Sequence, residues 1–415
     1  MAHQFSTVDW VAMETLRQFK HRSEIFAAMN HKHEEEFKKA FAVGDSVRVK
    51  FPWQPTIRDG MTYTGQNIER IETTVRADQP FGIDFDFDTI DKLLNMERGE
   101  EKVRKEYIEP AGRYLAAEAD KRAAKFAAEN TGNIFGVLQT NPTTFDATSA
   151  AARQRFAELE SLSDDMKMYV PPAVMRAIKG GSDANLTRFG ATDEIKKLYK
   201  KGVVGTADGF EWYESMSLKT HMAGTWAGAV TLSSAPANGA QSLAVTCTTG
   251  DTFKKGDKIG LPSVYRVNRF TRDTTETTNA KTVTVAEDTV GVASAATIPI
   301  VGKLYFSGPY QNISAQPAAS GALTLFPGTT SPSGKVGKMG LVFGENAYAG
   351  ISLPLPMPGK GVEKAQQYTD PDTGISLSYI VDFDTKERRW MNRFDVLIGF
   401  GVLWADDAAG VILCA

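Results

Sequence analysis

The sequence predicts a mixed α+β fold, and three patterns along the chain indicate it. Residues 10–41 space their apolar side chains as a helix does. Residues 44–80 contain two stretches with the period-two alternation of strands. Residues 225–334 are rich in Thr, Ser, Ala, Gly and Val, with short strand-like runs between turns. A chain of 415 residues is long enough for about two or three domains.

Composition excludes several classes of protein. Hydrophobic residues make up 42% of the chain and charged residues 23%, which is typical of a folded protein. No apolar run reaches the roughly 18 residues of a transmembrane helix, and the polar start of the sequence shows no signal peptide, so we expect no membrane partner. The two cysteines, Cys247 and Cys414, exclude a disulfide framework and paired CxxC zinc sites. A net charge of −3 argues against a protein that grips nucleic acid along its surface.

The N-terminal segment is predicted to be an arm that packs on something else, because its helical stripe has too few apolar positions for a domain. Asp9 is placed to cap the start of its helix. The hairpin that follows is too polar to bury a core, and an isolated hairpin is marginally stable in water. We therefore expect the chain to work in contact with copies of itself.

The rest of the chain contains one long predicted helix and several shorter elements. The long helix runs from Pro110 to Glu129 and stops at Asn130–Gly132. Either it starts with Pro110 at its first position, or a longer helix is kinked there. Shorter helices are predicted at Thr143–Leu162, Pro171–Ile178 and Asp193–Tyr199, and strands at Ile83–Asp88, Ile375–Phe383 and Phe394–Phe400.

Patterns for catalysis or metal binding are weak throughout. Asp84, Asp86 and Asp88 would lie on one face of a strand, about 7 Å between neighbours, and could hold a divalent cation. The solvated face of an amphipathic strand explains them better. His31 and His33 are two residues apart and do not share a helix face. Because the sequence lacks HExxH, GxSxG and a complete phosphate loop, we expect no catalytic residue, cofactor or metal, and no enzyme.

Four stretches occur in an order that is more specific than any one of them. They are GIDFDFD and YIEPA (82–88 and 107–111), KGVVG through THMAG (201–224), KGD, VYRVN and SGPYQ (255–311), and LPLP, DTGIS and RFDVLIG (353–399). The set resembles the major capsid proteins of tailed bacteriophages with the Hong Kong 97 fold, and especially the coat proteins of short-tailed phages with an inserted β domain. The resemblance covers most of residues 80–400.

This resemblance implies a Hong Kong 97-like capsid fold with an inserted small β-barrel domain. The implied parts are an N-terminal arm (1–43), an extended loop or E-loop (44–82), a peripheral domain with the spine helix (83–140, plus strands from about 370–400), an axial domain with the C-terminal return (141–224 and 334–415), and the inserted β domain (225–333). The implied function is a major capsid protein that self-assembles into the icosahedral shell enclosing phage double-stranded DNA.

The resemblance also implies partners and a location. The chain would form hexamers and pentamers with many copies of itself, guided by a scaffolding protein, with a portal protein at one vertex. Packaged double-stranded DNA would touch the shell only weakly and without sequence preference, which suits the modest acidity of the chain. Assembly would take place in the cytoplasm of the bacterial host, and the product would be the virion capsid.

Candidate inter-subunit contacts follow from exposed charge on the hairpin and on the inserted domain. They are Arg58, Asp59, Arg70, Glu72, Arg76, Asp251, Asp257 and Asp273. Each exposed ion pair is worth only about 0–1 kcal/mol, and such weak contacts suffice when a closed shell repeats them many times. Two other classes stay open at this point. The chain could be another phage structural component, or a cytoplasmic binding protein with an appended β module.

Overall fold

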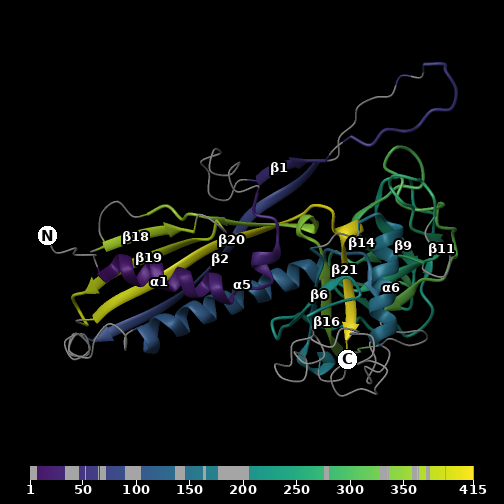
Figure 1. Cartoon of the computed structure of the whole chain (residues 1–415). Coiled ribbons are helices and arrows are strands. Elements are labelled where there is room, and N and C mark those ends of the chain that lie inside the picture. The colour runs from purple at the N-terminus through teal and green to yellow at the C-terminus, as the bar shows by residue number, and fades with distance from the viewer. Residues whose placement is uncertain are drawn as a thin grey trace, which may run out of the picture. The chain divides into compact units, whose positions relative to one another are not determined.

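The computed structural model describes residues 7–32, 46–51, 53–63, 65, 72–88, 104–135, 145–161, 165–175, 205–274, 280–326, 334, 336–357, 362, 364–370, 374–387 and 389–414. The fold combines helices and strands, as the sequence predicts, and it divides into two compact units (Figure 1). The first unit comprises residues 1–50, 72–123 and 348–403, and the second comprises residues 51–71, 124–347 and 404–415.

The first unit is built on a six-stranded antiparallel sheet. Its strands are β1 (Ser46–Lys50), β2 (Glu72–Asp88), β17 (Tyr348–Leu353), β18 (Lys364–Thr369), β19 (Ser376–Asp384) and β20 (Arg389–Val402). The strand order is β1-β2-β20-β19-β18, and β17 also pairs with β20. Central β20 contains the predicted strand Phe394–Phe400, whose apolar side chains are buried as expected of a strand covered on both faces.

Strand β2 joins two stretches of the sequence into one element of 17 residues. Its first part pairs with β1, with Lys50 opposite Glu72, which gives the hairpin that the alternation predicts. Its second part pairs with β20 after a register shift between Arg76 and Gln79. Within Phe81–Asp86 the apolar side chains are half-buried and the aspartates are exposed, so the predicted amphipathic alternation is confirmed there.

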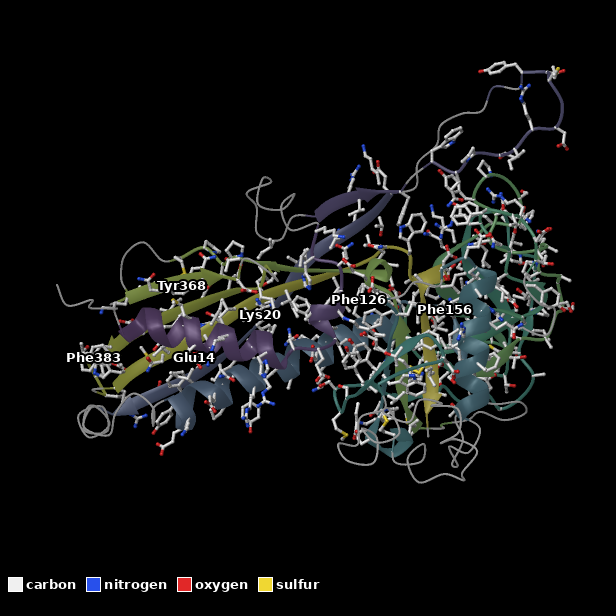
Figure 2. All side chains as sticks on the ribbon, in the orientation of Figure 1. Glu14, Lys20, Phe126, Phe156, Tyr368 and Phe383 are labelled. Carbon is white, nitrogen blue, oxygen red and sulfur yellow. The ribbon has the colours of Figure 1, made fainter. Side chains whose placement is uncertain are left out.

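One helix of this unit lies along the sheet. Helix α1 (Thr7–Arg22) runs beside β18 and β19 (Figure 1). Lys20, labelled in Figure 2, forms an ion pair of 3.0 Å with Asp370 beyond the end of β18. The helix ends at Arg22 and a short 3-10 turn, η1 (Phe26–Ala28), follows, so the predicted continuous helical stripe is too long. Asp9 lies inside α1 and therefore does not cap its start.

The long predicted helix is α5 (Glu109–Glu129), and its ends agree with the prediction within one residue. A π-helical turn, η2 (Arg104–Ile108), leads directly into it, so Pro110 lies in the first α-helical turn of a longer helical segment. Proline is tolerated there because its missing N–H would have no α-helical partner. At Gly112 an added Cβ would lie 2.7 Å from the Cβ of Gln18, so this glycine lets α1 approach α5 closely.

The second unit contains a seven-stranded mixed sheet. Its strands are β3 (Ile134–Phe135), β4 (Lys167–Val170), β5 (Thr206–Ala207), β6 (Phe210–Glu214), β7 (Thr220–Met222), β16 (Val336–Phe343) and β21 (Ala409–Cys414). The order is β3-β21-β16-β4-β6-β5, and β7 also pairs with β16. Two short turns, η4 (Glu345–Ala347) and α10 (Ala405–Ala408), lie near its strand ends.

Helix α6 (Phe145–Glu158) covers this sheet through an apolar core. Phe156, labelled in Figure 2, contacts the rings of Phe135 and Phe210 at 5.5 and 6.1 Å between centroids. The helix ends at Glu158, four residues before the predicted end at Leu162. The prediction at Pro171–Ile178 is described only as far as Met175, and the one at Asp193–Tyr199 lies outside the described residues.

Residues 225–326 form three small sheets around their own apolar core. Their strands are β8 (Thr231–Leu232), β9 (Ala240–Thr246), β10 (Thr252–Phe253), β11 (Lys258–Tyr265), β12 (Ala280–Thr284), β13 (Thr289–Val290), β14 (Ala295–Leu304) and β15 (Thr324–Phe326). The sheets have the orders β12-β11-β15, β14-β9-β8 and β10-β13. Single bridges join the two three-stranded sheets at both sides, through Val285 with Ile300 and through Thr231 with Ala322. The side chains between them form one core that includes Trp226, Ile259 and Leu325.

Candidate functional site

The β1–β2 hairpin carries its charge on exposed side chains. Glu72 lies 3.8 Å from Lys50 and 3.7 Å from Arg48, so it pairs across the two strands within its own hairpin. Arg76, farther along β2, is exposed as well. A cross-strand pair of this exposure contributes little to stability. Its position fits a strand edge whose side chains are available to a neighbour.

The loop between these strands exposes large apolar side chains. Ile57, Met61 and Tyr63 are 86%, 99% and 86% exposed, and Trp53 is 38% exposed. Arg58 and Asp59, in the same loop, are exposed too. The sequence interpretation emphasised the charges and missed the apolar residues, although their spacing between prolines and glycines could have revealed them. An exposed apolar group of this kind is typical of a surface that another molecule covers.

Two predicted contact residues are not exposed, and this corrects the expectation for them. Asp251 is 2% exposed and its carboxylate accepts hydrogen bonds from the backbone N–H groups of Ala227 and Thr248, at 2.7 and 2.8 Å. Asp257 is fully buried, and it contacts Nε2 of His221 at 2.7 Å. Both carboxylates satisfy groups of their own chain because these turns need acceptors for buried donors. Of the other predicted residues, Asp273 is exposed and Arg70 lies outside the described residues.

A buried lysine holds the end of helix α5. The Nζ of Lys258, on β11, donates to the carbonyl oxygens of Ala128 and Thr131 at 2.7 and 2.5 Å and to the hydroxyl of Thr284 at 2.8 Å. The last carbonyls of a helix have no partner within the helix, and a cation there also interacts favourably with the helix dipole. Burial lowers the pKa of Lys258 well below its usual range, and the nearby charge of Lys219 adds to this effect.

The adjoining helix residue joins a second set of charges. Glu129, the last residue of α5, pairs with Lys219 at 2.9 Å and with Lys255 at 3.3 Å. Burial raises the pKa of Glu129, but the hydrogen bond and charge of Lys219 outweigh it and lower the pKa overall. Three lysines thus hold the end of α5. Lys219 precedes the 225–326 region, and Lys255 and Lys258 lie within it.

The residues around α10 form a further ionic cluster with the same region. Asp406 accepts from Nζ of Lys281 at 2.9 Å and lies 3.5 Å from Nη1 of Arg266. Burial raises the pKa of Asp406, but the charges of Lys281 and Arg266 prevail and hold it well below its usual range. Burial lowers the pKa of Lys281 to about 8. Arg269 pairs with Asp407 and lies over the ring of Trp404, 3.8 Å from its centroid.

In the first unit, one carboxylate of α5 holds the segment that follows α1. Asp120 is 5% exposed, and its Oδ1 accepts from the hydroxyl of Ser23 and from the backbone N–H groups of Ile25 and Phe26, at 3.0, 3.1 and 2.9 Å. Its Oδ2 accepts from the backbone N–H of Glu24 at 3.0 Å. Burial raises the pKa of Asp120, and these four donors oppose the shift. The sequence contains no local motif for this contact.

The candidate metal ligands do not form a site in the part of the chain that the structure describes. Asp84 lies 3.8 Å from Nε of Arg393, which is a solvated ion pair on the exposed face of β2. In the part of the chain that the structure describes, no three His, Cys, Asp or Glu side chains are grouped to hold a metal ion. Among the helices described, none has both the length and the apolar character needed to cross a bilayer. Nε2 of His31 donates to the carbonyl oxygen of Phe26 at 3.0 Å, and His33 is not among the described residues.

Exposed apolar and charged side chains on a hairpin and its loop are typical of a surface that another molecule covers. The family model for "P22 coat protein - gene protein 5" matches residues 84–414. The chain therefore belongs to the P22 coat protein family, and it is a major capsid protein that forms the shell of a virion. A comparison with curated proteins gave no match.

Several solved structures of phage proteins are similar to this chain at low identity. The structure titled Mycobacterium phage Che8 is 13% identical, covers 94% of this chain and 90% of its own, and has a TM-score of 0.49. The capsid of Cyanophage P-SCSP1u is 13% identical over 90% and 84% of the two chains, with a TM-score of 0.43. The mature capsid of bacteriophage PhiM1 is 11% identical over 95% and 87%, with a TM-score of 0.40.

Proposed function

We propose that this coat protein builds an icosahedral shell around phage double-stranded DNA, in a Hong Kong 97-like fold, as hexamers and pentamers. The observation that carries the proposal is the family match over residues 84–414. A scaffolding protein would guide assembly in the bacterial cytoplasm and a portal protein would occupy one vertex. DNA would contact the wall weakly, since a net charge of −3 offers few excess cations to its phosphates. The role is structural and requires no catalytic step.

We propose further that residues 225–333 are an inserted β-barrel domain. Support comes from the two three-stranded sheets, which are bridged at both sides and enclose one apolar core. Support also comes from where the chain enters and leaves this region. It enters after β7 and leaves before β16, and these two strands pair with each other. An insertion between paired strands leaves the parent sheet intact, because both ends of the insertion return to one place.

In the proposed shell, the hairpin and its loop lie across a neighbouring subunit. The predicted contact residues that remain are Arg58, Asp59, Arg70, Glu72, Arg76 and Asp273. Exposed ion pairs between subunits contribute little binding free energy, although they help to align the two surfaces. Burial of an apolar side chain contributes about 1.5–3 kcal/mol. We therefore expect Ile57, Met61 and Tyr63 to supply most of the affinity of this contact, and the charged residues to set its geometry.

Sedimentation followed by negative-stain imaging tests the proposal. The expressed chain, with and without the phage scaffolding protein, is expected to give closed shells or tubes of megadalton size. A stable monomer or small oligomer under every condition would contradict it. The double variant Ile57→Ser with Met61→Ser should assemble poorly while its unassembled form melts like the wild type, and Asp59→Lys should show a smaller defect. Normal shells from the double variant would exclude the loop as a main contact.

A further inference from the structure

The loop of residues 268–274 presents one aromatic side chain on a rigid support. Phe270 is 61% exposed. The side chain of Asn268 holds the loop from both ends of its amide. Its Oδ1 accepts from the backbone N–H groups of Phe270 and Thr271 at 2.7 and 3.2 Å, and its Nδ2 donates to the carbonyl of Glu158, the last residue of α6, at 2.7 Å. Phe270 therefore projects from a closed turn that is tied to a helix.

Two arginines fasten the same loop on its other sides. Arg269 pairs with Asp407 and stacks on Trp404. Arg272 adopts a left-handed backbone conformation, with φ of 64°, and its guanidinium donates to the carbonyls of Pro309 and Gln311. A side chain other than glycine keeps such a conformation only where its surroundings impose it, and these positions gather at binding sites. These contacts fix the backbone on both sides of the exposed Phe270 side chain.

A second exposed group lies on and beside the seven-stranded sheet of the same unit. Met216, Met222 and Val336 are 68%, 55% and 60% exposed. Val336 and Met222 are directly opposite each other in the β16–β7 ladder. Lys338, two residues along β16, places its Nζ 3.1 Å from the carbonyl of Met216 and 3.8 Å from its sulfur. These four residues form the methionine patch, an apolar surface with one cation.

We propose that the Phe270 loop of one copy of this chain docks on the methionine patch of a second copy. The two surfaces are complementary in character, since the loop offers an aromatic ring with the exposed carboxylate of Asp273, and the patch offers flexible apolar side chains with the ammonium of Lys338. Methionine sulfur contacts aromatic rings favourably, and its unbranched side chain repacks readily. A rigid aromatic anchor that enters such a surface loses little entropy on binding.

The proposed contact is head-to-tail, because the loop and the patch are different surfaces of one unit. Repetition of a head-to-tail contact closes a ring when the rotation between copies allows it. An adaptable methionine surface would let the same loop dock when the angle between copies differs, as it must between rings of five and rings of six. The inference rests on the proposed function, since it assumes rings of both kinds.

A charge exchange between the two surfaces tests the contact. Asp273→Lys and Lys338→Glu should each raise the apparent critical concentration for shell assembly, measured by sedimentation, and the combined variant should restore it toward the wild-type value. Phe270→Ser should raise that concentration by about tenfold, as expected from the loss of one buried aromatic anchor. Val292→Ser is the matched control, since Val292 is 69% exposed and belongs to neither surface.

The outcomes separate this inference from the proposed function. Thermal melting of each unassembled variant should match the wild type, which excludes misfolding as the cause of any defect. If all variants form normal shells at the wild-type concentration, the contact is wrong and the shell-forming function stands. If both single charge variants are defective and the combined variant is no better than either, Asp273 and Lys338 do not meet and the proposed docking is overturned. If the wild type forms no shells, the proposed function itself fails.

Discussion

Two buried charges hold two parts of the molecule in opposite ways. Asp120, in the first unit, is an anion that gathers four donors, three of them backbone N–H groups. Lys258, in the second unit, is a cation that gathers three acceptors, two of them backbone carbonyls. Each charged group hydrogen-bonds backbone groups at the end of a helical segment. Without it, these backbone groups would be buried without a partner.

The difference between the two sites lies in what remains when the charge is removed. A backbone N–H can donate one hydrogen bond, and buried N–H groups without an acceptor are rare in proteins. A carbonyl oxygen has two lone pairs and tolerates incomplete pairing more often. At the lysine site, moreover, the hydroxyl of Thr284 already donates to the carbonyl of Thr131. Loss of the anion should therefore cost more than loss of the cation.

The largest effect is expected for Asp120→Ala. Three backbone donors, two of them buried, lose their acceptor, and each unsatisfied buried donor costs about 1–3 kcal/mol, so we expect a loss of about 3–5 kcal/mol in the free energy of unfolding. Urea unfolding of the unassembled chain measures it. Asp120→Asn keeps an oxygen for Ser23, Ile25 and Phe26 and should lose about half as much.

Glu118→Ala is the control for that series, because Glu118 is on the same helix and its ion pairs with Lys121 and Arg122 are partly exposed to solvent. It should change the free energy of unfolding by about 0.5 kcal/mol or less. An Asp120→Ala variant as stable as this control would show that the segment after α1 is held by apolar packing alone.

Local patterns in the sequence predicted what local interactions decide. Helix α5 was bounded to within one residue because a proline and an Asn-Thr-Gly stop flank its apolar stripe. The alternation of Ile83 to Asp86 predicted the exposed face of β2 for the same reason.

Tertiary contacts decided the rest, and no local pattern contains them. The donors to Asp120 are three backbone N–H groups and one hydroxyl, all almost a hundred positions away, so any carboxylate on that helix face would have looked alike in the sequence. Asp257 was expected to be an exposed contact residue, and no role was predicted for Lys258 next to it. Their burial follows from the arrival of the end of α5 and of His221 at that turn. Surface exposure was therefore predicted better than the burial of polar residues.

An intermediate effect is expected for Lys258→Met. The substitution keeps most of the side-chain volume and removes the cost of burying an ammonium, but it leaves the carbonyl of Ala128 without its partner and removes a cation from the end of α5. We expect a net loss of about 1–3 kcal/mol, measured by urea unfolding. A loss larger than that of Asp120→Ala would reverse the order argued from donor and acceptor chemistry.

The smallest effect is expected at Asp406, whose side chain is about half exposed. Its pKa in the folded chain is held below the unfolded value of about 3.9, so its contribution is present above that pH and is lost as the pH falls toward the folded pKa. Asp406→Asn should therefore lower stability at pH 7 by about 1 kcal/mol, after allowance for solvent screening. The variant should also lose less stability than the wild type between pH 4 and pH 2. Urea unfolding at a series of pH values measures both effects, and parallel curves for the two proteins would show that Lys281 and Arg266 are neutralised by other groups. Such a result would mean that Asp120 and Lys258 contribute to the free energy of unfolding and that the charge of Asp406 contributes little.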